Sequence, residues 1–235
     1  MRKIHLTPEI IFKLYNIKKP EKIDFAFSFD YKNLALKTLA CFKNPEKIIN
    51  FSGLVFWQAD YKDKKIIISY GGSYAPDTAI GTELLCFLGA GKILRIGLCG
   101  GLKKEMEIGD LIVADSILDY TGVSKFYPAK LKISLSLNER IKKIFGGYKI
   151  YCGKVCSTDA LFRETKDFIK KIKDKNCIAI EMALSGFFKV AGFYKKEAGS
   201  LLVVSDNLIT GKIGFREKKL FERLNIVIRK ILQFL

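Results

Sequence analysis

The stretch from Ile93 to Asp110, ILRIGLCGGLKKEMEIGD, constrains the fold more than any other part of the chain. An apolar run from Ile93 to Ile96 is followed at once by Gly97, Gly100 and Gly101. This pattern predicts a buried strand that runs into a glycine-opened turn. Such turns at the carboxyl ends of strands let backbone N–H groups approach a ligand closely in an open α/β sheet.

Arg95 lies inside this apolar strand. A buried guanidinium is costly unless an anion meets it, and its fork geometry suits phosphate. A structural carboxylate would satisfy the same group, so both partners stay open at this point. The GLCGG segment itself matches neither the dinucleotide-binding fingerprint nor a Walker loop.

A chain of 235 residues with 49% hydrophobic content can bury one substantial core, which predicts a single domain over residues 1–235. The net charge of +17 comes from 41 basic and 24 acidic residues, and the lysines are scattered over the whole length. This distribution favours a solvated surface and attraction to small anions over nucleic-acid binding. We therefore expect neither nucleic acid nor a membrane as a partner.

The cysteines and the single histidine exclude some kinds of catalytic and metal site. The six cysteines form no CxxC pair and lie mostly in apolar segments, which predicts reduced thiols in a cytoplasmic protein. His5 is the only histidine, so a His-based zinc site and a Ser-His-Asp triad are excluded, and no metal is expected. His5 itself reads most simply as a surface residue. No signal peptide or membrane-length apolar run is present.

Apolar runs and helical periodicity alternate after a strand-rich first third. We predict strands over 23–29, 48–51, 54–59, 65–70, 93–96, 110–118, 148–156, 177–180 and 201–204. We predict helices over 9–16, 33–42, 76–88, 136–145, 165–172, 183–194 and 215–235. This order predicts a mixed, mainly parallel sheet with helices on both faces, a three-layer α/β/α fold.

Polar groups recur directly after these apolar strands, where a ligand crevice is expected. They are Gly72-Ser73, Arg95 with Cys99-Gly100, Glu181-Met182 and Ser205-Asp206. A carboxyl group at the end of the LLVV strand would be partly desolvated, which raises its pKa and suits it to donate a proton near neutrality. Asp206 could equally cap a following turn that Asn207 completes.

The motifs YGGSYAP, ILRIGLCGGLKKEMEIGD, STDALF, AIEM and VVSDN, in that order, resemble the nucleoside phosphorylase family. This family includes hexameric purine nucleoside phosphorylase, uridine phosphorylase and methylthioadenosine phosphorylase or nucleosidase. The resemblance implies an α/β fold around a mixed, barrel-like sheet and cleavage of an N-glycosidic bond by phosphate or by water. It also implies inorganic phosphate as co-substrate, no other cofactor, and a homo-oligomer (a dimer or a trimer of dimers) with shared active sites.

Position by position, the resemblance assigns Asp206 as the acid that protonates purine N7, an acid that uridine-specific members lack. It implies phosphate binding by Arg95, Ser73 and Gly72, and ribose binding by Met182, Glu181 and, from across the dimer, His5. It places the base beside Cys99, Gly100, Phe162, Leu161, Ile180 and Ser205.

The chain departs from the family pattern at several of these points. The segment from Phe29 to Asn33 lacks the glycine and arginine of Gly-Asp-Pro-x-Arg, and the neighbour's arginine falls near Ser52. Leu98 replaces a small hydroxyl residue, and Ala183 replaces the carboxylate that holds the ribose hydroxyls. We therefore expect a purine nucleoside phosphorylase in which lysines such as Lys32 replace the arginines. The alternatives are a nucleosidase that uses water and a nucleoside-binding relative without turnover.

Overall fold

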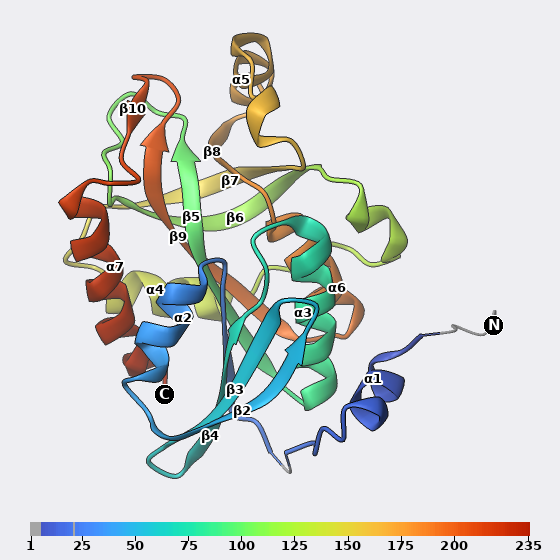
Figure 1. Cartoon of the computed structure of the whole chain (residues 1–235). Coiled ribbons are helices and arrows are strands. Elements are labelled where there is room, and N and C mark those ends of the chain that lie inside the picture. Colours follow the sequence, from blue (N-terminus) through green and yellow to red (C-terminus); the bar gives the residue numbers. More distant parts are fainter. Residues whose placement is uncertain (1–5, 21) are drawn as a thin grey trace.

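The computed structural model describes residues 6–20 and 22–235 (Figure 1). The strands are β1 Phe25–Phe29, β2 Lys43–Phe51, β3 Leu54–Tyr61, β4 Lys64–Tyr70, β5 Lys92–Gly101, β6 Leu111–Tyr120, β7 Ile150–Thr158, β8 Cys177–Glu181, β9 Glu197–Asn207 and β10 Lys212–Ile213. The α-helices are α1 Pro8–Leu14, α2 Lys32–Leu39, α3 Ala75–Leu88, α4 Leu135–Ile144, α5 Lys166–Lys173, α6 Leu184–Phe193 and α7 Lys218–Ile231. Short 3-10 helices are η1 Val123–Phe126, η2 Leu161–Arg163 and η3 Leu232–Phe234.

The strands form one mixed sheet that partly closes on itself. Its order is β10-β9-β6-β7-β8-β5-β1-β4-β3-β2, and β9 also pairs in parallel with β5. That extra pairing closes β9, β6, β7, β8 and β5 into a barrel, while β1, β4, β3 and β2 extend from β5 as an open arm. The predicted mixed, barrel-like sheet is therefore confirmed.

Helices cover both faces of the sheet, as the alternation of apolar runs predicts. One apolar core contains buried side chains of α1, α3 and α6, such as Phe12, Leu85 and Phe187. A second core on the opposite face contains those of α2, α4 and α7, such as Leu34 and Ile141. Figure 1 shows the same two groups of helices on either side of the sheet, with α5 apart from both.

Several helix ends follow from local sequence. Thr7 caps α1 by accepting a hydrogen bond from the N–H of Ile10, and Thr165 caps α5 by accepting one from Phe168. The helix α3 ends at Gly89, whose φ of 101° is the left-handed conformation that glycine adopts without steric cost. Among the described residues, no helix has the length and apolar character that a membrane crossing requires.

Several boundaries differ from the prediction: β2 begins at Lys43 instead of residue 48, for example, and α2 ends at Leu39 instead of residue 42. Three further corrections bear on the site and on the closing helix. The strand β5 continues through Gly101 instead of opening into a turn, because Gly100 and Gly101 pair with both β8 and β9. The strand β9 likewise extends to Asn207, so Ser205 and Asp206 lie within it and not after it. The closing helix α7 begins at Lys218, because the chain after Ile213 first forms a turn.

Candidate active site

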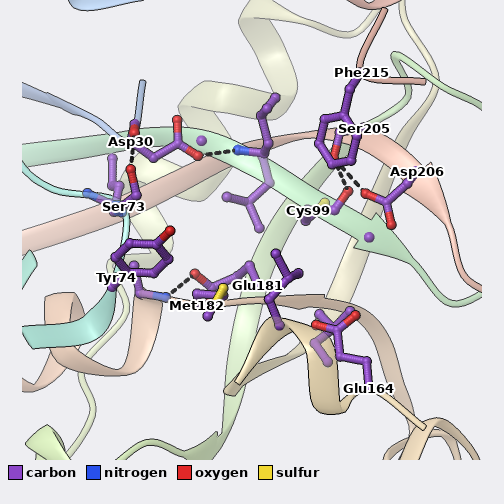
Figure 2. A pocket seen from close by; sticks show the side chains of 18 residues that line it. Asp30, Ser73, Tyr74, Cys99, Glu164, Glu181, Met182, Ser205, Asp206 and Phe215 are labelled. Carbon is purple, nitrogen blue, oxygen red and sulfur yellow. Dashed lines mark hydrogen bonds between the residues drawn. The ribbon is translucent and has the colours of Figure 1, made fainter. Parts of the chain in front are cut away.

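The predicted strand ends meet around one cavity with about 180 Å³ of free space, at the carboxyl ends of β1, β4, β5, β8 and β9 (Figure 2). It is lined by Asp30, Ser73, Tyr74, Arg95, Gly97, Leu98, Cys99, Gly100, Leu161, Glu164, Ile180, Glu181, Met182, Ala183, Leu202, Ser205, Asp206 and Phe215. Asp206 and Arg95 therefore line the same cavity, and Leu98 and Leu161 line it without filling it.

Four residues expected at the site are placed elsewhere or lie outside the described part of the chain. Phe162 is 95% exposed and does not line the cavity, because η2 turns Leu161 inward and Phe162 toward solvent. Gly72 lies behind the wall, where its carbonyl oxygen accepts a hydrogen bond from Arg95. Lys32 is exposed and does not line the cavity, so it replaces no arginine there. His5 lies outside the described residues.

A β-bulge aims Asp206 into the cavity. Val204 pairs with Cys99 and Asp206 pairs with Gly100, which leaves Ser205 as the extra residue of β9. Bulges of this kind redirect side chains, and here both Ser205 and Asp206 face the cavity. The Ser205 hydroxyl lies 2.7 Å from Oδ1 of Asp206 and 3.2 Å from the carbonyl oxygen of Cys99. Burial raises the pKa of Asp206, and the Ser205 hydrogen bond only partly offsets this.

Asn207, and not Asp206, caps the turn that follows β9. Its Nδ2 donates to the carbonyl oxygens of Lys103 and Met106 at 2.9 and 2.8 Å. Its Oδ1 accepts from the N–H groups of Ile209 and Thr210 at 2.9 and 3.1 Å. Because Asn207 supplies these bonds, the carboxyl group of Asp206 is left to face the cavity.

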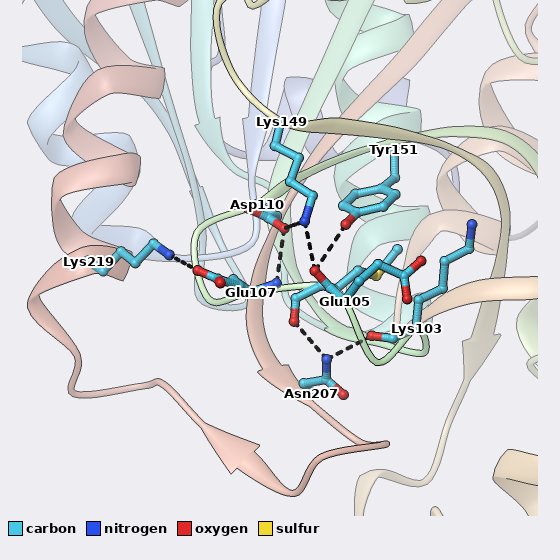
Figure 3. A network of polar contacts seen from close by, with 9 residues as sticks. Lys103, Glu105, Glu107, Asp110, Lys149, Tyr151, Asn207 and Lys219 are labelled. Carbon is cyan, nitrogen blue, oxygen red and sulfur yellow. Dashed lines mark hydrogen bonds and ion pairs between the residues drawn. The ribbon is translucent and has the colours of Figure 1, made fainter.

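The loop after β5, whose carbonyl oxygens accept hydrogen bonds from Asn207, is also held by charged side chains (Figure 3). Asp110 accepts a hydrogen bond from the N–H of Glu107 at 2.9 Å and so braces the turn before β6. Lys149 donates to the carbonyl oxygen of Glu105 at 2.7 Å, and Lys219 pairs with Glu107. The wall behind Asp206 is therefore held from several elements.

The guanidinium of Arg95 is bonded within the protein. Arg95 is 1% exposed; Nη2 donates to the carbonyl oxygen of Gly72 at 2.7 Å and Nη1 to the hydroxyl of Ser28 at 3.3 Å. Burial lowers its pKa, and the charges of Asp30 and Glu181 partly restore it. Arg95 forms no salt bridge with any carboxylate of the described residues, so the structural carboxylate that was one of its two expected partners is not in direct contact.

Asp30 lines the cavity together with Arg95. Its Oδ2 accepts a hydrogen bond of 2.7 Å from the N–H of Leu98. Its Oδ1 is buried and has no hydrogen-bond partner among the described residues. Burial raises the pKa of Asp30, against the lowering effect of Arg95. The donors best placed for an anion are thus occupied by the chain's own oxygen atoms.

Glu181 serves the protein as a helix cap. Its carboxylate accepts hydrogen bonds from the N–H groups of Ala183 and Leu184 at 2.6 and 2.9 Å, and from the hydroxyl of Ser157. An acid at the start of α6 satisfies N–H groups that have no partner within the helix. Burial nevertheless raises its pKa. Met182, which follows, lines the cavity beside Ala183.

Sequence reasoning missed several lining residues, of which Glu164 matters most. It follows η2 and faces the cavity that Asp206 lines, and burial and the charge of Asp206 raise its pKa to about 7. Tyr74 and Phe215, both about half exposed, lie at the cavity as well. An acid just beyond the STDALF motif was the available sign for Glu164, whereas nothing in the sequence distinguishes Phe215 from other surface aromatics.

Comparisons with known proteins identify the family that shares this architecture. The model of the Phosphorylase superfamily matches residues 26–232. The chain is 27% identical to the DeoD-type purine nucleoside phosphorylase of Bacillus cytotoxicus over 191 residues, or 78% of this chain and 79% of that protein. The corresponding protein of Bacillus cereus is 26% identical over the same shares.

The fold is similar to that of a uridine phosphorylase from Vibrio fischeri ES114, with a TM-score of 0.81. The identity is 21%, and the match covers 92% of this chain and 96% of that structure. These relatives are nucleoside phosphorylases, which are pentosyltransferases, so the predicted family, fold and enzyme class are confirmed. The chain thus belongs to the phosphorylase superfamily.

Proposed function

We propose that this protein cleaves the N-glycosidic bond of a purine nucleoside by ribosyl transfer to phosphate, with Asp206 as the general acid at the base. The observation that carries this proposal is the carboxyl group of Asp206, which faces the cavity with a raised pKa and has Ser205 as its one hydrogen-bond partner among the described residues. The DeoD-type relatives, which are named as purine nucleoside phosphorylases, support the choice of a purine.

The chemistry requires this acid because a purine anion is a poor leaving group. A proton from Asp206 at N7 lets the C1′–N9 bond break with its electron pair on the base, through an oxocarbenium-like state. The base then departs as a neutral molecule, and an oxygen of the acceptor bonds to C1′. The ribose packs on Met182 in this scheme, and the purine lies between Leu161, Ile180 and the backbone at Cys99.

Water is a second candidate for the acceptor, and the environment of Asp30 favours it. The N–H of Leu98 already donates to Asp30, and Arg95 donates to Gly72 and Ser28. Each charge-assisted hydrogen bond to an anion contributes about 1.5–3 kcal/mol, so donors held by the chain weaken phosphate binding strongly. A phosphate ion must displace Asp30 to use the Leu98 donor.

One assay separates these functions. The protein is incubated with inosine, adenosine, methylthioadenosine and uridine, with and without phosphate, and free base is measured. Purine release that depends on phosphate supports phosphorolysis, and release without it supports hydrolysis. No release from any nucleoside supports a binding protein without turnover, and release of uracil alone contradicts the purine assignment.

Variants test the role of the acid. We expect Asp206→Asn to abolish purine release while the fold stays intact, because the amide cannot supply the proton. Asp167→Asn, at an exposed carboxylate on α5, is the matched control and should retain activity. An unchanged rate in Asp206→Asn removes this residue from the mechanism.

We further propose that the protein acts in the cytoplasm as a homo-oligomer, a dimer or a trimer of dimers. In that assembly, His5 is donated to the sugar 5′ end of the neighbouring site. Light scattering tests the assembly, and a monomer in solution would discard the shared site.

A further inference from the structure

The cavity holds a second acid that the proposed mechanism does not use. Glu164 enters from the segment after η2, and Asp206 enters from the bulge of β9. Figure 2 shows the two side chains at the same end of the cavity, away from Asp30 and Ser73. No hydrogen bond or salt bridge joins the Glu164 carboxylate to any other described residue, although it is partly buried.

The charged groups around this pair do not neutralise it. On its outer side, Glu164 also borders a hollow lined by Lys166, Lys170, Lys173 and Asp174. None of these lysines forms a salt bridge with Glu164 or Asp206 within the described residues. At the far end of the cavity, Arg95 is bonded to Gly72 and Ser28, and the remaining acids there are Asp30 and Glu181. Arg163, which precedes Glu164 in the chain, is exposed and does not line the cavity.

We propose that Glu164 and Asp206 act as a pair of acids that keeps one proton between them at neutral pH, and that this proton is the one given to the leaving base. The inference rests on the proposed function, and it makes Glu164 a positioning residue that acts through Asp206. Two neighbouring carboxyl groups in a partly desolvated site resist double ionisation, so the pair titrates as a unit and its second proton is lost late. The pKa of Glu164, raised to about 7 by burial and then by the charge of Asp206, agrees with this behaviour.

The proton is conserved through the step. The O–H bond of the protonated pair breaks at Asp206 and an N7–H bond forms on the purine, while the C1′–N9 electron pair moves to the base. The pair is left with two negative charges, and Glu164 restores the starting state by taking up, through solvent, the proton that the acceptor (phosphate or water) loses once its oxygen has bonded to C1′. A single carboxyl group of ordinary pKa would instead be ionised at neutral pH and unable to donate.

The test is the pH dependence of kcat/KM for purine release. In the wild type we expect activity to fall on the alkaline side with an apparent pKa near 7. In Glu164→Gln, loss of the neighbouring charge should move that limb to lower pH by about one unit, with about a tenfold loss of rate above it and little change well below it. Glu164→Asp, which keeps the charge, should return the alkaline limb most of the way to its wild-type position. Glu222→Gln on α7 is the exposed control.

An alkaline limb that stays in place in a folded Glu164→Gln variant overturns the pair. A wild-type limb below about pH 5 overturns it as well, because an isolated carboxyl group titrates there. Carbon-13 NMR titration of the Asp206 carboxyl group, assigned with Asp206→Asn, follows the same pair without substrate. A pair shows a lower apparent pKa for Asp206 in Glu164→Gln than in the wild type, and equal values contradict it. This measurement stands even if no purine nucleoside is cleaved, a result that would refute the proposed function alone.

Discussion

Replacing Asn207 by alanine tests whether this one side chain holds the loop behind Asp206 in place. Asn207 is 1% exposed and makes four hydrogen bonds, two donated to the carbonyl oxygens of Lys103 and Met106 and two accepted from Ile209 and Thr210. Each neutral hydrogen bond contributes about 0.5–1.5 kcal/mol net, and a buried group left unpaired costs about 1–3 kcal/mol.

The four hydrogen bonds contribute unequally to the free energy of unfolding. Met106 is 3% exposed, so its carbonyl oxygen has little access to water once Asn207 is gone, whereas Thr210 lies in an exposed turn. We therefore expect Asn207→Ala to lower the free energy of unfolding by about 3 kcal/mol. Purine release should fall too, because the bulge that aims Asp206 loses its support on one side.

Urea denaturation measures the change. Trp57, the only tryptophan, is buried on β3 and reports unfolding by fluorescence. The midpoint should fall at an unchanged slope, since the denatured chain exposes the same surface. Asn225→Ala, at an exposed position of α7, is the control and should change stability by less than about 0.5 kcal/mol. A loss below about 1 kcal/mol in Asn207→Ala would refute the reasoning.

Three further predictions concern packing, ionisation and thiol access. Gly81→Ala puts a Cβ 2.8 Å from the carbonyl oxygen of Gly71, so we expect a loss of about 1–3 kcal/mol by urea denaturation, against no loss in Gly91→Ala, where no atom lies within 4 Å. Because the folded-state pKa of Glu164 is raised from 4.5 to about 7, the folded protein binds this proton first as the pH falls. The stability of the wild type relative to Glu164→Gln should therefore rise from pH 7 to 4.5 in urea titrations; a flat difference contradicts the shift. A thiol reagent at neutral pH should label Cys41 and Cys152 in the native protein and all six cysteines after denaturation, and early labelling of the buried thiols would contradict the structure.

The strands and their convergence could be predicted because both depend on local patterns. The apolar runs at Ile93 to Ile96 and Leu201 to Val204 are buried in the structure, and the polar residues after them face one cavity. The ordered motifs, taken together, are also sufficient to indicate the family from the sequence alone.

The details of the site depend on contacts between distant segments, which the sequence does not display. The bulge at Ser205 exists because Gly100 pairs with Asp206 across the sheet, and no local pattern encodes that register. The resemblance implies ribose binding by Glu181, and only the position of α6 shows its carboxylate engaged as a cap. The exchange of Phe162 for Leu161 at the cavity similarly follows from a single turn of 3-10 helix.

Asp206 and Asn207 are adjacent in the chain and have separate roles: Asp206 faces the cavity as the proposed proton donor, and Asn207 holds the surrounding backbone in place. The side chain of Asn207 joins the loop after β5 to the turn that follows β9, so the hairpin from Leu208 to Gly214 starts from a rigid anchor. Its exposed residues include Thr210 in the turn and Ile213, at 72%, in β10. A library that varies only the turn at Thr210 and Gly211, and keeps the pairing of Ile213 with Asp206, can therefore change the outer surface of this hairpin without shifting the proton donor.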